Sequence, residues 1–327
     1  RMQGGAFYAL ERGLNMKWLG MIFAVLAGLA SFGIGCATQV NAIATVANEN
    51  FNIPPAAVGV VIAVLTAIVI FGGIKSIASV CEKLVPFMAI FYVLGCIVIL
   101  CMNYDFIIPA IVTICKLAFT PGAAAGGLVG TGILMAMRFG IARGLFSNEA
   151  GSGSAPCAAA AADISHPAKE GLLQSLGVFI DTLLICSCSA MIMLMTPPGF
   201  IDGLQGMDLL QAAMNYHLGS FGPIFIAVIL WLFSFSTFIG ILFYARPNVA
   251  YLFGDNWLSQ TLYKILALIM LFIGCLAAYT FVWDLGDVGV GLMTIFNLAA
   301  LFPLAPKALS QLKEYEAFRK KEKEEAV

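Results

Sequence analysis

The chain has 327 residues, of which 61% are hydrophobic and only 11% are charged, and its mean hydropathy is +0.96. A soluble domain is about a quarter charged, and a chain this apolar cannot cover a water-facing surface with polar groups. The net charge of −1 also provides no basic field for phosphates. These values exclude a soluble enzyme, a disordered chain and a nucleic-acid-binding protein, and they predict an integral protein of a lipid bilayer.

Long apolar runs predict eight membrane spans, because about 20 apolar residues cross a bilayer as a helix. The spans cover approximately 19–48, 56–73, 78–102, 128–163, 170–196, 220–245, 260–282 and 284–305. Every backbone group in lipid needs an internal partner, so these runs predict an all-α helical bundle. We expect a transmembrane domain over residues 1–306. The polar, Lys/Glu-rich residues 307–327 predict a cytoplasmic tail, either a solvated helix or a frayed end.

The basic residues predict the orientation of the bundle. If both ends of this chain lie in the cytoplasm, as eight spans require, 14 of the 17 Lys and Arg residues are cytoplasmic. Arg138 and Arg143 fall inside a span, and only Lys116 falls outside. We therefore expect a multi-pass protein of the cell membrane. On the external side, residues 105–127 and 199–221 are moderately apolar and predict helical caps over the membrane face.

The first span contains a polar patch from Gly33 to Asn41. Gln39 within it is costly in lipid and can bind an amino or carboxylate group. The alternative for Gln39 is a hydrogen bond between helices.

The fourth span is interrupted where the middle of the membrane should be. Its sequence from Arg143 to Pro156 is rich in glycine and serine and contains Asn148 and Glu149. This composition predicts a discontinuous helix, whose free N–H groups suit a carboxylate and whose free carbonyls suit Na⁺. The alternative is a packing seam of small residues, which fits 157–162 but not the ionisable segment 146–153.

Four charged residues, Arg138, Arg143, Glu149 and Asp181, lie inside the predicted bundle and need partners, because ionisable residues in a membrane normally face the interior and pair. Arg143 and Glu149 either bridge the break or contact a substrate directly. Asp181, followed by Thr182 in the fifth span, either lines a cavity or pairs with an arginine.

The sixth span contains the sequence Ser-Phe-Ser-Thr at 234–237. The adjacent hydroxyls of Ser236 and Thr237, together with carbonyls of a neighbouring broken helix, would give a small cation a site made of oxygen atoms. The alternative is that these hydroxyls bond back to their own helix.

Together these motifs resemble the alanine/glycine:cation symporter family, and the matches keep their order over almost the whole chain. The matching segments are Gly4–Gly5 through Tyr8 to 11–14, 32–35 with Gln39, the long and specific 144–156, 166–167, 177–182, 235–237 and 251–254. The resemblance implies a LeuT-type inverted-repeat bundle of the APC superfamily and Na⁺-coupled symport of small neutral amino acids such as alanine or glycine. It also implies that two or three further spans precede this chain in the family, so that eight of about eleven are present.

The resemblance assigns roles residue by residue. Gln39, Phe146, Ser147, Asn148 and Gly151 would contact the substrate, and Ser236 and Thr237 would be sodium ligands. Na⁺ is the only coupling ion implied, and no covalent cofactor is implied.

The chain departs from the family pattern at three places. Ile241 stands where a tryptophan usually follows Gly240, which would reshape the substrate pocket. Ser152 replaces a usual apolar residue in the unwound segment, and the sequence Ala-Arg-Pro at 245–247 replaces a common Gly-Glu-Arg pattern, which would change the inner gate.

Three other interpretations compete with sodium symport. A proton-coupled transporter of the same fold would titrate Glu149 or Asp181. A channel or a non-transporting membrane subunit does not explain the ionisable broken segment. An intramembrane enzyme would need a nucleophile–base pair or a metal site, whereas His166 and His217 both fall in predicted loops and no His-Glu-x-x-His motif occurs. We therefore expect a transporter and not an enzyme.

Overall fold

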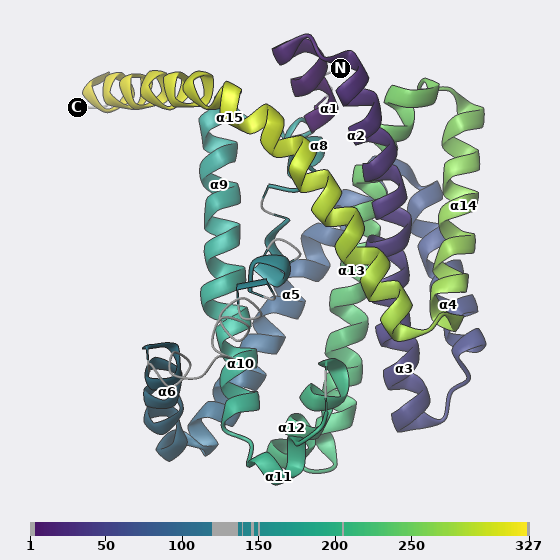
Figure 1. Ribbon diagram of the computed structural model, residues 1–327, viewed down its shortest axis with the longest axis vertical. Coiled ribbons are helices and arrows are strands. Elements are labelled where there is room, and N and C mark those ends of the chain that lie inside the picture. The colour runs from purple at the N-terminus through teal and green to yellow at the C-terminus, as the bar shows by residue number, and fades with distance from the viewer. Residues whose placement is uncertain are drawn as a thin grey trace, which may run out of the picture.

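The computed structural model describes residues 4–119, 137–138, 140–144, 147–149, 151–204 and 206–325. All regular structure in these described residues is helical (Figure 1). The helices are α1 (Ala6–Tyr8), η1 (Ala9–Gly13), α2 (Lys17–Ala30), η2 (Ser31–Thr38), α3 (Gln39–Phe51), α4 (Pro55–Phe71), α5 (Gly73–Met102), α6 (Tyr104–Phe119), α8 (Ala155–Ala159), α9 (Pro167–Phe179), η4 (Ile180–Cys186), α10 (Ser187–Leu194), α11 (Pro198–Ile201), α12 (Gly206–Leu218), α13 (Phe221–Phe253), α14 (Trp257–Leu276) and α15 (Tyr279–Glu325).

Six helical stretches are long and apolar enough to cross a membrane. They are Lys17–Phe51, Lys75–Met102, Pro167–Leu194, Phe221–Phe253, Trp257–Leu276 and Phe281–Lys320, and the 17-residue α4 is a shorter apolar helix. Seven of the eight expected spans therefore fall on helices. The predicted fourth span, 128–163, lies largely outside the described residues, and its described end from Gly151 contains turns and the short α8.

One predicted boundary is wrong. The expected span 260–282 ends at Leu276, where Ala277 takes an extended conformation and α15 begins two residues later. The side-chain amide of Asn41 in α3 donates to the carbonyl oxygens of Gly274 at 3.1 Å and Ala277 at 2.8 Å. These two bonds satisfy carbonyls at the end of α14 that have no partner within the helix.

Two of the long helices contain a wider π-helical segment in the middle. In the first, α2 and α3 are joined by η2, and in the second, α9 and α10 are joined by η4. Gly33 and Gly35 lie within η2, where their low α-helical preference favours a departure from regular helix. Short π segments inside α-helices occur frequently at functional sites.

The tightest packing lies where α4, α13 and α14 meet the first long helix. Ile62, Phe238 and Leu271 are almost fully buried there. A Cβ atom at Gly274 of α14 would lie 2.6 Å from the Cα atom of Ala37. The two backbones can approach this closely only because Gly274 has no side chain. This group of helices forms a rigid half of the bundle.

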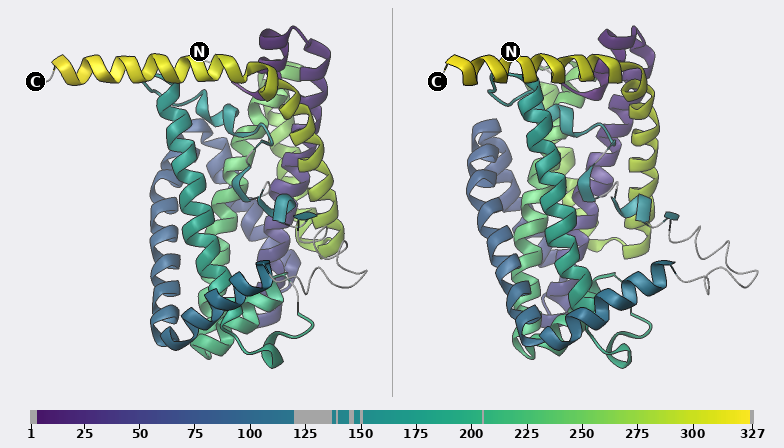
Figure 2. Two further views of the ribbon diagram at one scale, coloured as in Figure 1. Left: turned by 60° about the vertical axis from the view of Figure 1, so that its left-hand side comes forward. Right: turned by 90° about the vertical axis from the view of Figure 1, so that its left-hand side faces the viewer.

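The two ends of the bundle differ. Both ends of the chain lie at one end, which we call the terminal end, and α11 and α12 lie at the opposite end (Figure 1). The predicted external caps are confirmed as helices, because α6 and α12 occupy much of the two segments concerned. The predicted tail is helical, since α15 continues to Glu325 and its axis turns sharply near Pro303 and Pro306 (Figure 2).

Candidate functional site

A cavity of about 650 Å³ lies beside the interrupted segment, between η2, α13 and α15. Its wall draws residues from the first long helix, the segment 147–155, α13 and α15. The polar and small residues that line it are Ser31, Gly35, Gln39, Ser147, Asn148, Glu149, Ser152, Gly153, Ser154, Gln174, Ser236, Thr237, Gly240, Tyr244 and Asn248. Eleven residues were expected at the site. Seven of them line this cavity: Gln39, Ser147, Asn148, Glu149, Ser236, Thr237 and Ile241.

The backbone of the interrupted segment cannot continue as a helix. Glu149, Gly151 and Gly153 all have positive φ angles, of 49°, 85° and 89°. The first of these is a non-glycine residue in the left-handed region, which is uncommon and is found at functional sites. Ser152 closes the turn, since its hydroxyl donates to the carbonyl oxygen of Glu149 at 2.8 Å and its backbone N–H to the same oxygen at 3.2 Å. The predicted helix break is therefore present in the described residues.

Helix α15 holds the break in place from the other side. The amide of Asn297 donates to the carbonyl oxygen of Gly151 at 2.9 Å. A Cβ atom at Gly153 would lie 2.8 Å from the Phe23 ring and 2.9 Å from the Asn297 side chain, so only glycine fits. Gly151 was expected to contact the substrate. Its carbonyl oxygen instead accepts a hydrogen bond from the side chain of Asn297. Asn297 was not predicted, although it is one of few strongly polar residues in an otherwise apolar run.

Gln39 and Ile241 both line the cavity. Gln39 is the first residue after the π segment η2 and is half buried. Ile241 of α13 packs against Gly35, where a Cβ atom would lie 2.1 Å from the Ile241 Cγ2 atom. The isoleucine therefore occupies space next to the glycine-rich wall of the first long helix.

Ser236 and Thr237 bond to their own helix, as in the alternative that the sequence left open. Both hydroxyls donate to the carbonyl oxygen of Phe233, each at 2.8 Å. A hydroxyl that donates its hydrogen still has two lone pairs. Since both residues line the cavity, their oxygen atoms can coordinate a cation there without breaking these hydrogen bonds.

The second π segment is connected to the interrupted segment by side-chain hydrogen bonds. The hydroxyl of Ser147 donates to Asp181 at 2.5 Å, and the hydroxyl of Thr182 donates to the side-chain oxygen of Asn148 at 3.0 Å. Asp181, for which the sequence left a cavity wall or an arginine partner open, therefore accepts a hydrogen bond from a serine of the break itself. Phe146, also expected at the site, lies outside the described residues.

Arg143 and Glu149 do not bridge the break. Arg143 makes a two-pronged ion pair with Asp287 of α15, with N–O distances of 2.9 and 3.1 Å, and its guanidinium lies 4.9 Å from the centre of the Trp283 ring. Glu149 instead accepts a hydrogen bond from the hydroxyl of Ser154. The bridging hypothesis is wrong because α15 supplies a closer carboxylate, 144 positions away in the sequence.

The comparison with protein families decides the identity of the chain. The model of the sodium:alanine symporter family matches residues 1–327. The chain belongs to the sodium:alanine symporter family. It is therefore part of a family of membrane transporters rather than an enzyme.

Relatives in this family come from bacteria and archaea. The chain is 39% identical over 315 residues to an uncharacterized transporter of Haemophilus influenzae, covering 96% of this chain and 65% of that protein. It is 41% identical over 323 residues to the amino-acid carrier protein AlsT of Bacillus subtilis, covering 97% and 67%. It is 39% identical over 333 residues to the sodium/alanine symporter AgcS of Methanococcus maripaludis, covering 99% and 72%. The chain thus spans about two thirds of the length of these relatives.

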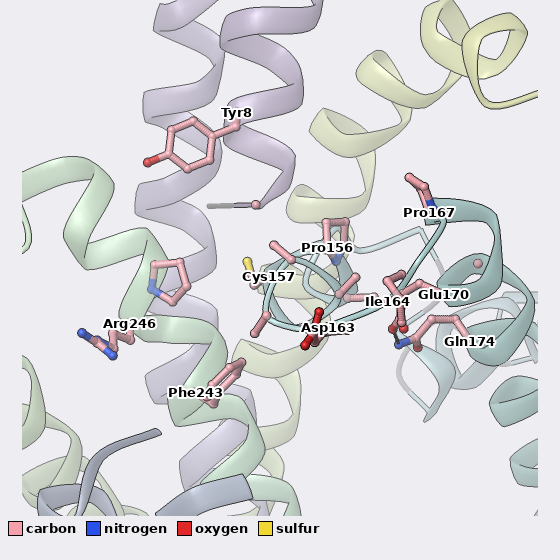
Figure 3. A pocket seen from close by; sticks show the side chains of 18 of the residues that line it. Tyr8, Pro156, Cys157, Asp163, Ile164, Pro167, Glu170, Gln174, Phe243 and Arg246 are labelled. Carbon is pink, nitrogen blue, oxygen red and sulfur yellow. Dashed lines mark hydrogen bonds between the residues drawn. The ribbon is translucent and has the colours of Figure 1, made fainter. Parts of the chain in front are cut away.

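A second, larger cavity of this symporter chain lies at the terminal end of the bundle. It has a volume of about 1040 Å³, and Figure 3 shows α8 between Tyr8 and Arg246 on one side and Glu170 and Gln174 on the other. Ala155 and Gln174 line both cavities, so the two spaces adjoin.

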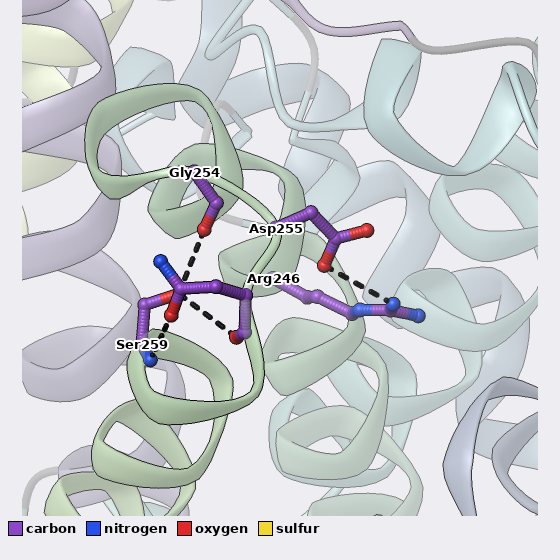
Figure 4. A network of polar contacts seen from close by, with 5 residues as sticks. Arg246, Gly254, Asp255 and Ser259 are labelled. Atoms are coloured by element: carbon purple, nitrogen blue, oxygen red, sulfur yellow. Dashed lines mark hydrogen bonds and ion pairs between the residues drawn. The ribbon is translucent and has the colours of Figure 1, made fainter.

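The departure from the family pattern at 245–247 lies in the wall of this second cavity. Arg246 makes an ion pair with Asp255 at 3.5 Å beyond the end of α13 (Figure 4). Ser259 secures the same turn, because its hydroxyl donates to the carbonyl oxygen of Gly254 at 2.7 Å. The arginine at this position therefore has a carboxylate partner on the loop that follows its own helix.

Proposed function

We propose that this chain binds a small neutral amino acid together with Na⁺ and moves both across the cell membrane by alternating access, in a LeuT-type inverted-repeat bundle. One observation carries the proposal. Gln39, Ser147, Asn148, Ser236, Thr237 and Ile241 come from three separate parts of the sequence and line one cavity at a helix break. A volume of about 650 Å³ lies within the range of sites that enclose small molecules.

The break suits the two charges of an amino acid. Its left-handed turns at Glu149, Gly151 and Gly153 expose backbone N–H groups that can receive a carboxylate. The side-chain oxygen of Gln39 on the facing wall can accept a hydrogen bond from the ammonium group. Ile241 on the cavity wall then bears on the room for the side chain of the substrate, because it is smaller than the tryptophan that is usual in the family.

The sodium ion would bind next to the amino acid. Hard cations take several oxygen ligands, and the hydroxyl oxygens of Ser236 and Thr237 retain free lone pairs. Carbonyl oxygens released where a helix is unwound would complete the set. The sodium/alanine symporter of Methanococcus maripaludis, to which the chain is 39% identical, is the relative whose name supports this ion and this substrate.

Transport requires the bundle to open alternately to each side. We assign both ends of the chain to the cytoplasm, because 14 of the 17 Lys and Arg residues then lie there. The cavity at the terminal end then serves as the cytoplasmic release path. The Arg143–Asp287 ion pair joins the interrupted segment to the first turns of α15, which begins in the half of the bundle away from the terminal end (Figure 1). It would hold the outer side closed in this state.

The test is uptake by the protein, as its gene encodes it, in proteoliposomes. Labelled alanine, glycine and larger neutral amino acids are compared with and without an inward Na⁺ gradient. We expect Na⁺-dependent uptake of alanine or glycine, reduced in Gln39→Ala and in Thr237→Val. Uptake that does not depend on the Na⁺ gradient would refute the coupling. Uptake by Gln39→Ala equal to that of the wild type would refute the assigned site.

A proton-coupled carrier is the second candidate. Glu149 lines the central cavity and is an ionisable group inside the membrane. Two relatives are named as sodium/proton-dependent alanine carriers: the YrbD protein of Bacillus subtilis, 37% identical, is a putative one, and the protein of Bacillus sp. PS3 is 33% identical. If protons are coupled, a pH gradient alone drives uptake and Glu149→Gln abolishes that component while the Na⁺-driven component remains.

A further inference from the structure

The last part of α15 leaves the bundle and lies across its end. The helix passes Pro303 and Pro306, turns, and then runs nearly perpendicular to the long helices as far as Glu325 (Figure 2). It crosses the start of α9 and extends beyond the bundle on that side (Figure 2). We call residues 307–325 the overhanging helix. In a membrane, its overhanging part lies at the level where the lipid headgroups surround the protein.

A single contact fixes which side of the overhanging helix faces the bundle. The ring of Tyr315 packs on the ring of His166, with the centroids 5.2 Å apart. His166 is the residue that caps the start of α9, so Tyr315 faces toward the membrane side. Residues three, four and seven positions apart share one side of an α-helix. Leu312 and Arg319 therefore lie on the same side as Tyr315.

The side of the helix that faces the membrane combines apolar and basic residues. Leu309 and Leu312 are 60% and 36% exposed, so the protein itself does not bury them. Arg319 follows on the overhanging part and is exposed. Glu314 points away, since it accepts a hydrogen bond from Gln311 at 2.7 Å on the flank. The exposed Glu316 is the acidic residue that shares the membrane side.

This arrangement fits a helix that lies in the membrane interface. Such helices insert an apolar side at the boundary between headgroups and acyl chains and place basic residues at the headgroups. Arginine binds phosphate with two parallel hydrogen bonds, and each basic residue near an anionic surface contributes about 1 kcal/mol. If the bundle spans the bilayer, lipid is the neighbour on this side, so a phospholipid headgroup fits there better than a partner protein.

We propose that the overhanging helix is a binding surface for anionic phospholipid: Leu309, Leu312 and Tyr315 sit at the apolar level and Arg319 binds a phosphate headgroup. This interaction is separate from substrate transport. It would anchor the kinked end of α15, the helix whose earlier residues Asp287 and Asn297 hold the interrupted segment. The composition of the cytoplasmic leaflet would then act on a helix that forms part of the transport site.

The experiment measures hydrogen exchange of the peptide 307–325 in nanodiscs. The full-length protein is placed in phosphatidylcholine alone or in phosphatidylcholine with phosphatidylglycerol. We expect slower exchange of this peptide in the anionic nanodiscs and a smaller difference at high salt, because salt screens surface charges. Peptides from α14 serve as internal reference.

Two variants with equal loss of charge test the assigned side. Arg319→Gln should reduce the lipid-dependent protection from exchange about fivefold. This factor corresponds to about 1 kcal/mol for one basic residue. Lys313→Gln should keep the protection, because the exposed Lys313 precedes Tyr315 by two positions and lies about 160° around the helix. Leu312→Gln should weaken protection in both lipids.

Three results would overturn the proposal. Equal exchange in neutral and anionic nanodiscs would show that lipid charge has no role. An equal effect of Arg319→Gln and Lys313→Gln would show that the assigned side is wrong. Protection that appears in detergent and rises with protein concentration would assign the surface to a second copy of the chain.

Discussion

The helix α13 and the second long helix, α9–η4–α10, are both apolar and long enough to cross a membrane, but they are held in different ways. In the most apolar stretch of each, 50% of α13 is buried against 11% of the second long helix. Phe238 and Leu242 of α13 have no exposed surface, whereas residues 171–180 of the second helix are all exposed.

The second long helix has apolar packing only in α10, where Ile192 is fully buried, and its middle part is attached through polar contacts. Ser147 and Asn148 of the interrupted segment bond to Asp181 and Thr182, and Tyr92 of α5 shares a hydrogen bond of 2.5 Å with Ser189. Apolar packing resists displacement because interiors are close-packed, while a few side-chain hydrogen bonds can break and re-form. The comparison suggests a rigid half around α13 and a second half that moves together with the interrupted segment.

The largest expected effect comes from the rigid half. Gly274→Ala should destabilise the protein by about 3 kcal/mol, because the new Cβ atom would lie 2.6 Å from the Ala37 Cα atom and the backbone must move. Gly291→Ala in α15 is the matched control, since its Cβ atom meets nothing within 4 Å. The control should be neutral or gain up to about 1 kcal/mol from helix preference. Thermal unfolding in detergent measures both, and equal behaviour of the two variants would contradict the rigid packing.

The next effect concerns the interrupted segment. Gly153→Ala should lower substrate uptake by about tenfold or more, because it adds left-handed strain and contacts of 2.8–2.9 Å with Phe23 and Asn297. Gly203→Ala has a similar φ of 78° but open space around it, so it should leave uptake unchanged. Initial uptake rates at matched protein amounts give the comparison. If both variants lose uptake alike, the φ angle alone matters and the close approach to α15 does not.

These two sites also show what the sequence could and could not predict. The cluster of glycine and serine around Glu149 predicted the break, because low helix preference is a local property of the sequence and does not depend on contacts with distant residues. The partners of the break were not predictable in the same way. Arg143 pairs with Asp287 and Gly151 with Asn297, at separations of 144 and 146 positions, and hydropathy carries no information on such pairs.

The π segments were missed for a similar reason. Gly33 and Gly35 weaken the α-helix locally, but η4 contains no glycine and has the composition of an ordinary apolar helix. Its wider turns coincide with the bonds that Asp181 and Thr182 make to the interrupted segment. Tertiary contacts rather than local preference therefore decide where the second long helix departs from regular geometry.

A smaller effect is expected for the polar attachment of the second half. Ser147→Ala and Asp181→Ala should each weaken apparent substrate affinity about fivefold, since an exposed hydrogen bond to a carboxylate contributes about 1 kcal/mol. The double variant should cost little more than either single variant, because both remove the same bond. Ser187→Ala in the same helix is the control and should keep the affinity. Additive losses in the double variant would show that the two side chains act separately.

The smallest effect concerns pH at the opposite end of the bundle, where α12 caps the membrane face. Burial lowers the pKa of His217 below its ordinary value of 6.5, while a hydrogen bond from Nε2 to the carbonyl oxygen of Ile192 at 3.1 Å acts in the other direction. A second proton would have to bind Nδ1, which is buried and has no hydrogen-bond partner among the described residues. The folded state therefore favours the neutral ring.

The sign of the pH dependence follows from this lowered pKa. Below pH 6.5 the unfolded chain takes up a proton on His217 before the folded protein does, so the contribution to stability is complete above pH 6.5 and falls as the pH decreases. We expect the unfolding temperature of the wild type to drop more between pH 7.5 and 5.5 than that of His217→Gln. The variant is the reference because all other groups titrate equally in both proteins. A wild type and variant that shift in parallel would mean that the imidazole is protonated in the folded cap, and that Nδ1 finds a partner there when the pH falls.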